Sequence, residues 1–335
     1  MRTLVLINFV FLLCAFPFGC ARPPDVVLYT SVDQVFAEEV IKEVETQTGM
    51  RVALLTDTEA TKTVGLVQRL IAERPRPQAD VFWSSEILNT IALKQRGILE
   101  EYRSPSASSI PMRFKDPDGT WVGFAVRARV VVYNTDKVKR EDAPKSLEEL
   151  TSSRWRGKVA VASPLFGTSL THAAILFESW GNERAKKYFA ALRGSDALVV
   201  DGNSMVRDLV ARGEALVGLT DTDDVYVGIA KGWPIDIVLM DQDGLGACII
   251  PNTVAVIRGG PNPKNAKRLV DFLLSEHVER MLAKSDSHNS PVRSTIDVPK
   301  GVLRLTDIHL MSVDYDRAAE RIPETTAFLQ DIFLK

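Results

Sequence analysis

Strand-length apolar runs alternate with stretches of helical periodicity over the first third of the chain. The helical stretches repeat apolar positions every three or four residues, whereas the apolar runs between them are too short for helices. Three strands and three helices are predicted in turn, with the strands at 26–29, 51–55 and 80–83 and the helices at 35–48, 62–73 and 86–95. This alternation predicts a parallel sheet with helices on both faces.

The pattern restarts after a long β-prone run at 123–133. Further strands are predicted at 158–162, 197–200, 213–220 and 235–240, and helices at 146–150, 168–180, 183–192 and 204–212. A second long β-rich run at 247–257 precedes helices at 263–275, 276–284 and 325–334. Two α/β units joined by two long crossing segments predict a two-lobed clamshell, in which each lobe is a mostly parallel sheet flanked by helices.

The two crossing segments suggest how the chain is divided between the lobes. We expect lobe 1 to contain residues 21–126 and 250–300, and lobe 2 to contain residues 127–249. A C-terminal helical segment, residues 301–335, is expected to pack on lobe 2.

A strand that ends in three carboxylates is the clearest candidate for a site. The apolar run that begins after Gly213 stops at Asp221, and Asp223 and Asp224 follow within three residues. In open α/β sheets the carboxyl ends of strands border the crevice where ligands bind. Clustered like charges are costly unless a cation, a ligand donor or helix N–H groups offset them. The alternative is a simple helix cap, with Asp223 or Asp224 opening a helix over 225–231.

The N-terminus has the features of an export signal. A positive start and a short apolar stretch precede Cys20, and residues 1–20 are predicted to be a signal peptide of the lipoprotein type, with lipidation at Cys20. Plain secretion is the alternative, because Pro17 stands where a lipoprotein box usually has leucine. Cys248 is the only cysteine after this region, so a mature chain with Cys20 blocked has no intramolecular disulfide.

Composition argues against several function classes. The 41 Lys and Arg residues are interspersed with 43 Asp and Glu residues, so no basic face indicates nucleic-acid binding. The sequence has no Gly-x-Ser-x-Gly, Gly-rich phosphate-loop, Cys-x-x-Cys or His-Glu-x-x-His motif, and we expect a binding protein rather than an enzyme. Asp221-Thr222-Asp223 is like the metal-binding Asp-x-Asp of some glycosyltransferases, but an export signal disfavours an enzyme that uses cytosolic nucleotide sugars.

Other candidate residues lie where predicted helices begin. Asp33 and Glu86 precede or start helices of lobe 1, where they could either cap the helix or contact a ligand. Gly167-Thr168-Ser169 and Gly202-Asn203-Ser204 begin helices of lobe 2 and suit a phosphate, carbonate or carboxylate, although ordinary capping is equally consistent. Arg127 and Arg129 share one face of a strand and are expected to form ion pairs across the cleft, with binding of an anion as the alternative.

Five short segments in the same order resemble the extracellular solute-binding proteins of bacterial ABC importers, in the branch of the ferric-ion-binding proteins. They are Val27–Ser31, Ala79–Glu86, Arg127–Asp136, Arg154–Lys158 and Gly202–Ser204. The resemblance covers nearly the whole mature chain, and it implies a type II periplasmic-binding-protein fold with the ligand held between the lobes. Ferric-binding relatives carry a tyrosine pair where this chain has Asp223 and Asp224, so the phenolates that give those relatives their high affinity for Fe(III) are replaced by carboxylates here.

The resemblance implies a monomeric substrate-binding component of an ABC importer, in the periplasm or cell envelope, with a permease and its ATPase as partners. Its expected ligand is ferric iron or another hard cation with a carbonate or phosphate anion, and the alternative is a sugar phosphate or another phosphorylated or organic small molecule. A metal-dependent transferase is a more remote alternative. The expected ligand-binding residues are Asp33, Ser85, Glu86, Gly167, Thr168, Asn203, Asp221, Asp223 and Asp224. The expected metal ligands are Asp33, Glu86, Asp223 and Asp224, with Tyr133 as a further candidate.

Overall fold

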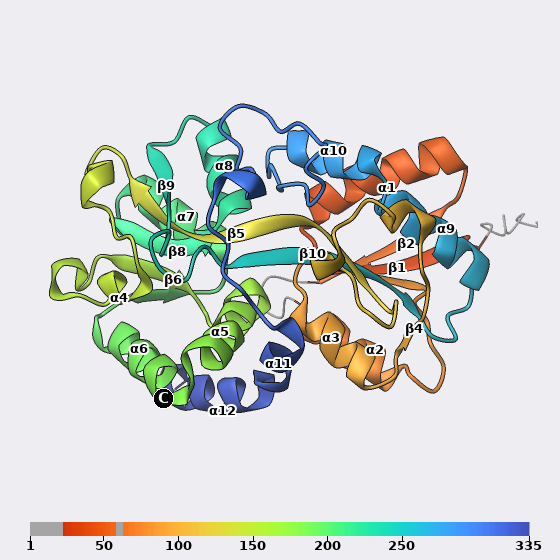
Figure 1. Ribbon diagram of the computed structural model, residues 1–335, viewed down its shortest axis with the longest axis horizontal. Helices are drawn as coiled ribbons and strands as arrows, with labels where there is room; N and C mark the ends of the chain where they lie inside the picture. Colours follow the sequence, from red (N-terminus) through yellow and green to blue (C-terminus); the bar gives the residue numbers. More distant parts are fainter. Residues whose placement is uncertain (1–22, 58–62, 335) are drawn as a thin grey trace, which may run out of the picture.

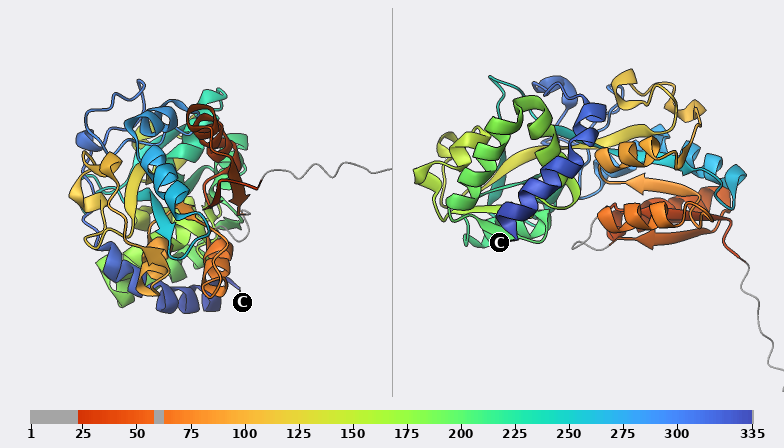
Figure 2. Two further views of the ribbon diagram at one scale, coloured as in Figure 1. Left: turned by 90° about the vertical axis from the view of Figure 1, so that its right-hand side faces the viewer. Right: turned by 90° about the horizontal axis from the view of Figure 1, so that it is seen from below.

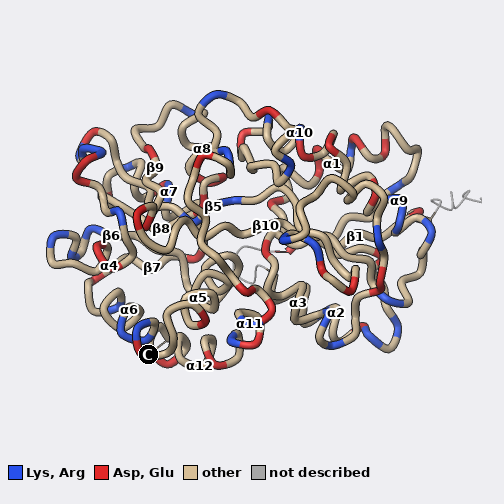
Figure 3. Tube along the Cα trace, viewed as in Figure 1, with Lys and Arg blue, Asp and Glu red and all other residues tan. Residues whose placement is uncertain are grey.

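The computed structural model describes residues 23–57 and 63–334, so the predicted leader and Cys20 lie outside the described residues. Two α/β lobes lie side by side and are joined by long strands that cross the middle of the molecule (Figure 1). This arrangement confirms the predicted two-lobed fold. Basic and acidic residues are interspersed over both lobes (Figure 3). Among the described residues, no helix combines the length and apolar composition that a membrane span requires.

Lobe 1 is built on a parallel β2-β1-β3 arrangement, extended by β10, which runs antiparallel to β3 and β4. Alternate residues of its strands face opposite layers: Leu28 packs with α1 and α9, and Tyr29 packs with α2 and α3. Its elements are β1 (Val26–Thr30), α1 (Gln34–Thr48), β2 (Val52–Thr56), α2 (Val64–Ala72), β3 (Val81–Ser84), α3 (Leu88–Gln95), β4 (Leu99–Glu100), β10 (Ile249–Ile257), α9 (Pro263–Leu273) and α10 (Glu276–Lys284).

Lobe 2 contains a second parallel set, β7-β6-β8, with α7 and α8 on one face and α5 and α6 on the other. β9 and part of a long crossing strand extend this sheet antiparallel. Its elements are α4 (Leu147–Leu150), β6 (Val159–Ala162), α5 (Gly167–Trp180), α6 (Asn182–Gly194), β7 (Leu198–Val200), α7 (Asn203–Arg212), β8 (Val217–Asp221), α8 (Thr222–Ala230) and β9 (Ile235–Leu239).

A single strand, β5 (Val122–Asn134), belongs to both lobes. Its residues up to Ala128 pair with β10, and those from Arg129 onward pair with β8 and β9. Every residue of β5 is buried, as expected for a strand covered on both faces. β5 therefore changes from the sheet of lobe 1 to the sheet of lobe 2 between Ala128 and Arg129. As a result, Arg129 belongs to lobe 2.

The C-terminal segment ends in α11 (Tyr315–Glu320) and α12 (Ile322–Phe333). α12 packs against α5 and α6 of lobe 2. α11, in contrast, packs against α3 of lobe 1 as well as α5 of lobe 2, and Ala318 and Ala319 are buried among side chains of lobe 1. The segment therefore contacts both lobes rather than lobe 2 alone (Figure 2).

Candidate functional site

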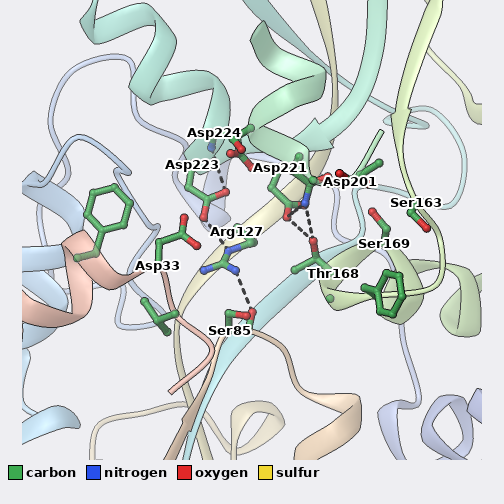
Figure 4. A pocket seen from close by; sticks show the side chains of 18 of the residues that line it. Asp33, Ser85, Arg127, Ser163, Thr168, Ser169, Asp201, Asp221, Asp223 and Asp224 are labelled. Atoms are coloured by element: carbon green, nitrogen blue, oxygen red, sulfur yellow. Dashed lines mark hydrogen bonds and ion pairs between the residues drawn. The ribbon is translucent and has the colours of Figure 1, made fainter. Parts of the chain in front are cut away.

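A cavity of about 40 Å³ lies between the two lobes (Figure 4). Residues of both lobes line this cavity, together with Arg127 of the shared strand β5. Lobe 1 contributes Val32, Asp33, Phe36, Ser85 and Asn289. Lobe 2 contributes Ala162, Ser163, Phe166, Gly167, Thr168, Ser169, Asp201, Gly202, Asn203, Ser204, Asp221, Asp223 and Asp224. Because a buried water needs about 10–15 Å³ of volume measured in this way, the cavity has room for a few water molecules or a small ion in this conformation.

Most of the predicted ligand-binding residues meet in this one cavity. The structure brings together Asp33, Ser85, Gly167, Thr168, Asn203, Asp221, Asp223 and Asp224, which are separated by up to 191 positions along the chain. Glu86 and Tyr133 are absent from the residues that line it, within the described part of the chain.

The three carboxylates at the end of β8 lie close together. Carboxylate oxygens of Asp221, Asp223 and Asp224 are all within 4.8 Å of one another. α8 begins at Thr222 with Asp221 in the capping position, so Asp223 and Asp224 occupy the first helical turn. The predicted cap at Asp223 or Asp224 is therefore wrong by a few residues. The positive end of the helix dipole partly offsets the repulsion among the three groups.

Asp221 is held by side chains of its own lobe and of β5. Its oxygens accept hydrogen bonds from Arg129 Nη1 at 2.8 Å, Thr168 Oγ1 at 2.5 Å and Asn203 Nδ2 at 2.9 Å. Arg129 and Asp221 are both almost wholly buried, with side chains 1% and 3% exposed. This ion pair joins the beginnings of α5 and α7 to the end of β8, and its main role is to position the lobe 2 side of the cavity.

Arg127 lies among the remaining carboxylates. Its Nε is 3.0 Å from Asp223 Oδ2, its Nη1 donates to the carbonyl oxygen of Ser85 at 2.9 Å, and its Nη2 donates to Asn252 Oδ1 at 3.2 Å. Burial alone would lower the pKa of Arg127, but the surrounding carboxylates, led by Asp223, more than offset it and raise the pKa. The expected ion pairing of Arg127 and Arg129 is confirmed, and Arg127 is a permanently charged part of the site.

The beginnings of α5 and α7 line the cavity next to Asp221, because Thr168 and Asn203 donate hydrogen bonds to its carboxylate. Within the described chain, no side chain caps either helix, and their first intrahelical bonds are donated by Leu170 and Val206. The amides before these two residues are therefore available to a ligand. Two uncapped helix N-termini, with the hydroxyl groups of Thr168 and Ser169 beside them, suit an anionic group.

The charges of the cavity are unequal. The carboxylates of Asp33, Asp201, Asp221, Asp223 and Asp224 line it, whereas Arg127 is the one arginine among its described lining residues and Arg129 lies behind it. The acidic side attracts a positively charged centre, and the helix starts attract an anionic group. A ligand that carries both is complementary to the two sides.

Glu86 lies at the start of α3, where the sequence left capping and ligand contact open, and it does not line the cavity among the described residues. It is fully buried, and its carboxylate accepts hydrogen bonds from the backbone N–H of Leu88 at 2.8 Å, that of Asn89 at 3.2 Å and Thr171 Oγ1 at 2.6 Å. It therefore caps α3 and links this helix to α5 in the other lobe. The expectation that Glu86 is a metal ligand is not supported by this geometry, because its oxygens are used inside the protein.

The burial of Glu86 predicts a pH dependence of stability. Burial raises its pKa above the ordinary 4.5, although the hydrogen bonds from Thr171, Asn89 and Leu88 act against this. Since the folded pKa is the higher one, the stability that Glu86 contributes is present below pH 4.5 and is lost as pH rises through the folded pKa. Urea unfolding should therefore show that wild type loses stability relative to Glu86→Gln as pH rises. A difference that stays constant, or changes with the opposite sign, would contradict the raised pKa.

Tyr133 also lies away from the cavity. Its ring packs in the core of lobe 2, and its hydroxyl donates to Asp236 Oδ2 at 3.3 Å. On β5 it pairs with Val217, four residues along β8 from Asp221. Burial, followed by the charge of Asp236, raises the pKa of Tyr133, which disfavours a phenolate ligand. The structure thus places Tyr133 in the core and not beside Asp223 and Asp224.

Several cavity residues were missed in the sequence. Phe36 and Phe166 are apolar residues next to predicted helix starts, and Asp201 directly precedes the Gly-Asn-Ser segment that begins α7. The position of Asp201 after β7 is a signal that could have indicated it. Asn289 lies in an irregular segment after α10, where no local pattern marks it.

Comparison with known proteins gives a consistent family. The family described as bacterial extracellular solute-binding protein matches residues 78–320. Iron uptake protein A1 of Synechocystis sp. is 24% identical over 319 residues, which cover 92% of this chain and 86% of that protein. A putative 2-aminoethylphosphonate-binding periplasmic protein of Salmonella typhi is 25% identical over 241 residues, with coverage of 69% and 67%.

Solved structures share the fold at low sequence identity. Iron-bound HitA from Pseudomonas aeruginosa aligns with a TM-score of 0.84 and 21% identity, over 93% of this chain and 100% of that chain. AfuA from Actinobacillus pleuropneumoniae, with fructose 6-phosphate bound, aligns with a TM-score of 0.81 and 23% identity, over 92% and 98% of the two chains. The two-lobed fold and the family match over most of the chain show that this protein belongs to the bacterial extracellular solute-binding proteins.

Proposed function

We propose that the protein is the solute-binding component of an ABC importer, anchored at the cell envelope through Cys20. It captures a small ligand between its lobes and delivers it to a membrane permease with its ATPase. The family match and the cavity between the lobes support this role. A ligand that contacts both lobes stabilises the closed form in proportion to its higher affinity for that form, and the permease then recognises the closed form.

The ligand we propose is a hard cation, such as ferric iron, bound together with a carbonate or phosphate anion. The observation that carries this proposal is the group of three carboxylates within 4.8 Å, next to the uncapped starts of α5 and α7. Oxygen donors suit hard cations. Asp223 and Asp224 would hold the cation from lobe 2 and Asp33 from lobe 1, while the helix starts and Arg127 would hold the anion. Two of the relatives that support this ligand are iron proteins by name.

An organic ligand with a phosphoryl or phosphonate group is the second candidate. It is favoured by the way Arg127 already neutralises Asp223 and by the three hydrogen bonds to Asp221, which leave fewer oxygens for a metal ion. An amine or hydroxyl group needs fewer carboxylate ligands than a hard cation. Relatives named for 2-aminoethylphosphonate and a structure with fructose 6-phosphate are in keeping with this candidate.

Calorimetry on protein freed of metal by chelation tests the proposal. We expect ferric citrate to bind and to bind more weakly as pH falls toward about 4, where carboxylates become protonated. Glucose 6-phosphate and 2-aminoethylphosphonate serve as organic probes in parallel titrations. Tight binding of either organic probe, with no heat from ferric citrate, would replace the cation with the second candidate. An absence of binding by all three would contradict both ligand classes.

A further inference from the structure

The orientation of one buried amide in the cavity is determined by a chain of hydrogen bonds. The chain starts at Arg127, whose guanidinium can only donate. Since Arg127 Nη2 is 3.2 Å from the side chain of Asn252, the atom it meets there must be the acceptor Oδ1. The Nδ2 group of Asn252 must then face the other way, and it donates to the backbone oxygen of Ala125 and to Asn289 Oδ1, the latter at 3.2 Å.

The same logic determines what Asn289 offers to a ligand. Its Oδ1 is the acceptor for Asn252, so its Nδ2 group must donate elsewhere. Asn289 is 4% exposed and lines the cavity, and its Nδ2 has no hydrogen-bond partner among the described residues. Leaving a buried amide donor without an acceptor is costly. We therefore expect a bound ligand to supply the acceptor for Asn289 Nδ2.

A second donor faces the cavity from the opposite lobe. Ser169, at the start of α5, is 8% exposed, and its Oγ also has no partner within the described chain. It lies beside Thr168 on the helix-start side of the site (Figure 4). Each lobe therefore presents one buried donor to the same small space, which is the pattern expected around an oxygen-bearing anion.

We propose that Asn289 is the lobe 1 contact of the ligand's anionic group, so that this group bridges the two lobes. The inference rests on the proposed function and adds a specific role for the anion. The helix starts of lobe 2 hold the anion in the open form, and Asn289 contacts it only when the lobes approach. The anionic group thus contributes to closure, and a ligand without an oxygen acceptor at this position closes the protein poorly.

Asn289→Asp tests this proposal with almost no change in shape. The new carboxylate can still accept from Asn252, but its second oxygen repels an anion instead of donating to it. The probes are ferric citrate, 2-aminoethylphosphonate and glucose 6-phosphate, all of which carry anionic oxygens, and binding is measured by calorimetry on the full mature chain. For each probe that wild type binds, we expect the affinity of Asn289→Asp to fall about tenfold or more.

Two further variants make the result specific. Asn265→Asp is the matched control, because Asn265 bonds to the backbone of Asp25 and to Arg268 away from the cavity, and it should bind as wild type does. Asn289→Ala removes the donor without adding charge and should lose affinity severalfold, which keeps the proposal testable if Asn289→Asp does not fold. Wild-type affinity in both Asn289 variants would overturn the inference and leave the proposed function intact. If wild type itself binds none of the three probes, both proposed ligand classes fail, and the inference fails with them.

Discussion

Replacement of Asp223 and Asp224 together by asparagine should abolish the stabilisation of this protein by its ligand. Both residues lie in the first turn of α8, face the cavity and keep their shape as asparagine. The change removes the two carboxylates that we assign to the positively charged centre, and Arg127 then adds repulsion because Asp223 no longer pairs with it. We expect affinity to fall at least about 100-fold, since truncation of one buried charged contact already costs several kcal/mol.

The measurement is the shift in melting temperature that saturating ligand produces in wild type, compared with the shift in the double variant. Asp196→Asn with Asp297→Asn is the matched control, because both of these carboxylates are mostly exposed and lie outside the cavity. A double variant of Asp223 and Asp224 that is stabilised as strongly as wild type would place the ligand elsewhere.

Among the variants proposed here, Arg129→Met should lower the free energy of unfolding the most. Arg129 and Asp221 form a nearly fully buried ion pair, and the substitution leaves Asp221 with only Thr168 and Asn203 as partners. Removal of one member of such a pair costs about 3–5 kcal/mol, because the other charge stays buried without compensation. The free energy of unfolding in urea should decrease by this amount.

Arg156→Met provides the comparison for this variant. Arg156 pairs with Asp196 at 2.9 Å, but its side chain is 61% exposed, so its removal should change stability little. If Arg129→Met were no more destabilising than Arg156→Met, the pair of Arg129 and Asp221 would not hold the lobe 2 side of the site as we describe.

The fold could be predicted from local patterns because the apolar periodicity of each strand and helix is contained within its own segment of the sequence. The apolar run at 123–133 corresponds to β5 at Val122–Asn134. The helix predicted at 35–48 corresponds to α1, which ends at Gly49 in the left-handed conformation with a φ of 69°. The acidic end of β8 and the helix starts at Gly167 and Asn203 could also be predicted, because local sequence patterns mark where each strand ends and each helix begins. In α/β sheets, strand ends and helix starts meet at one edge, so their proximity follows from topology.

The remaining parts of the site depend on contacts between distant segments. Glu86 was expected to face a ligand, but its partner Thr171 is 85 positions away and belongs to the other lobe, so its burial leaves no local trace. Asn289 is positioned by a register shift between β5 and β10 at Pro251 and Asn252, next to Ala125 at a φ of 44°. A one-residue irregularity of this kind changes which side chains meet, and no periodic pattern in the sequence encodes it.

The central claim is that the protein carries its ligand between the lobes on the acidic end of β8. Native mass spectrometry of protein purified without denaturation or added ligand tests it directly, with wild type and the Asp223→Asn, Asp224→Asn double variant in parallel. We predict that wild type carries a discrete added mass, whether a metal ion with its anion or an organic molecule, and that the double variant lacks it. The same added mass on both proteins, or none on wild type, would contradict the claim.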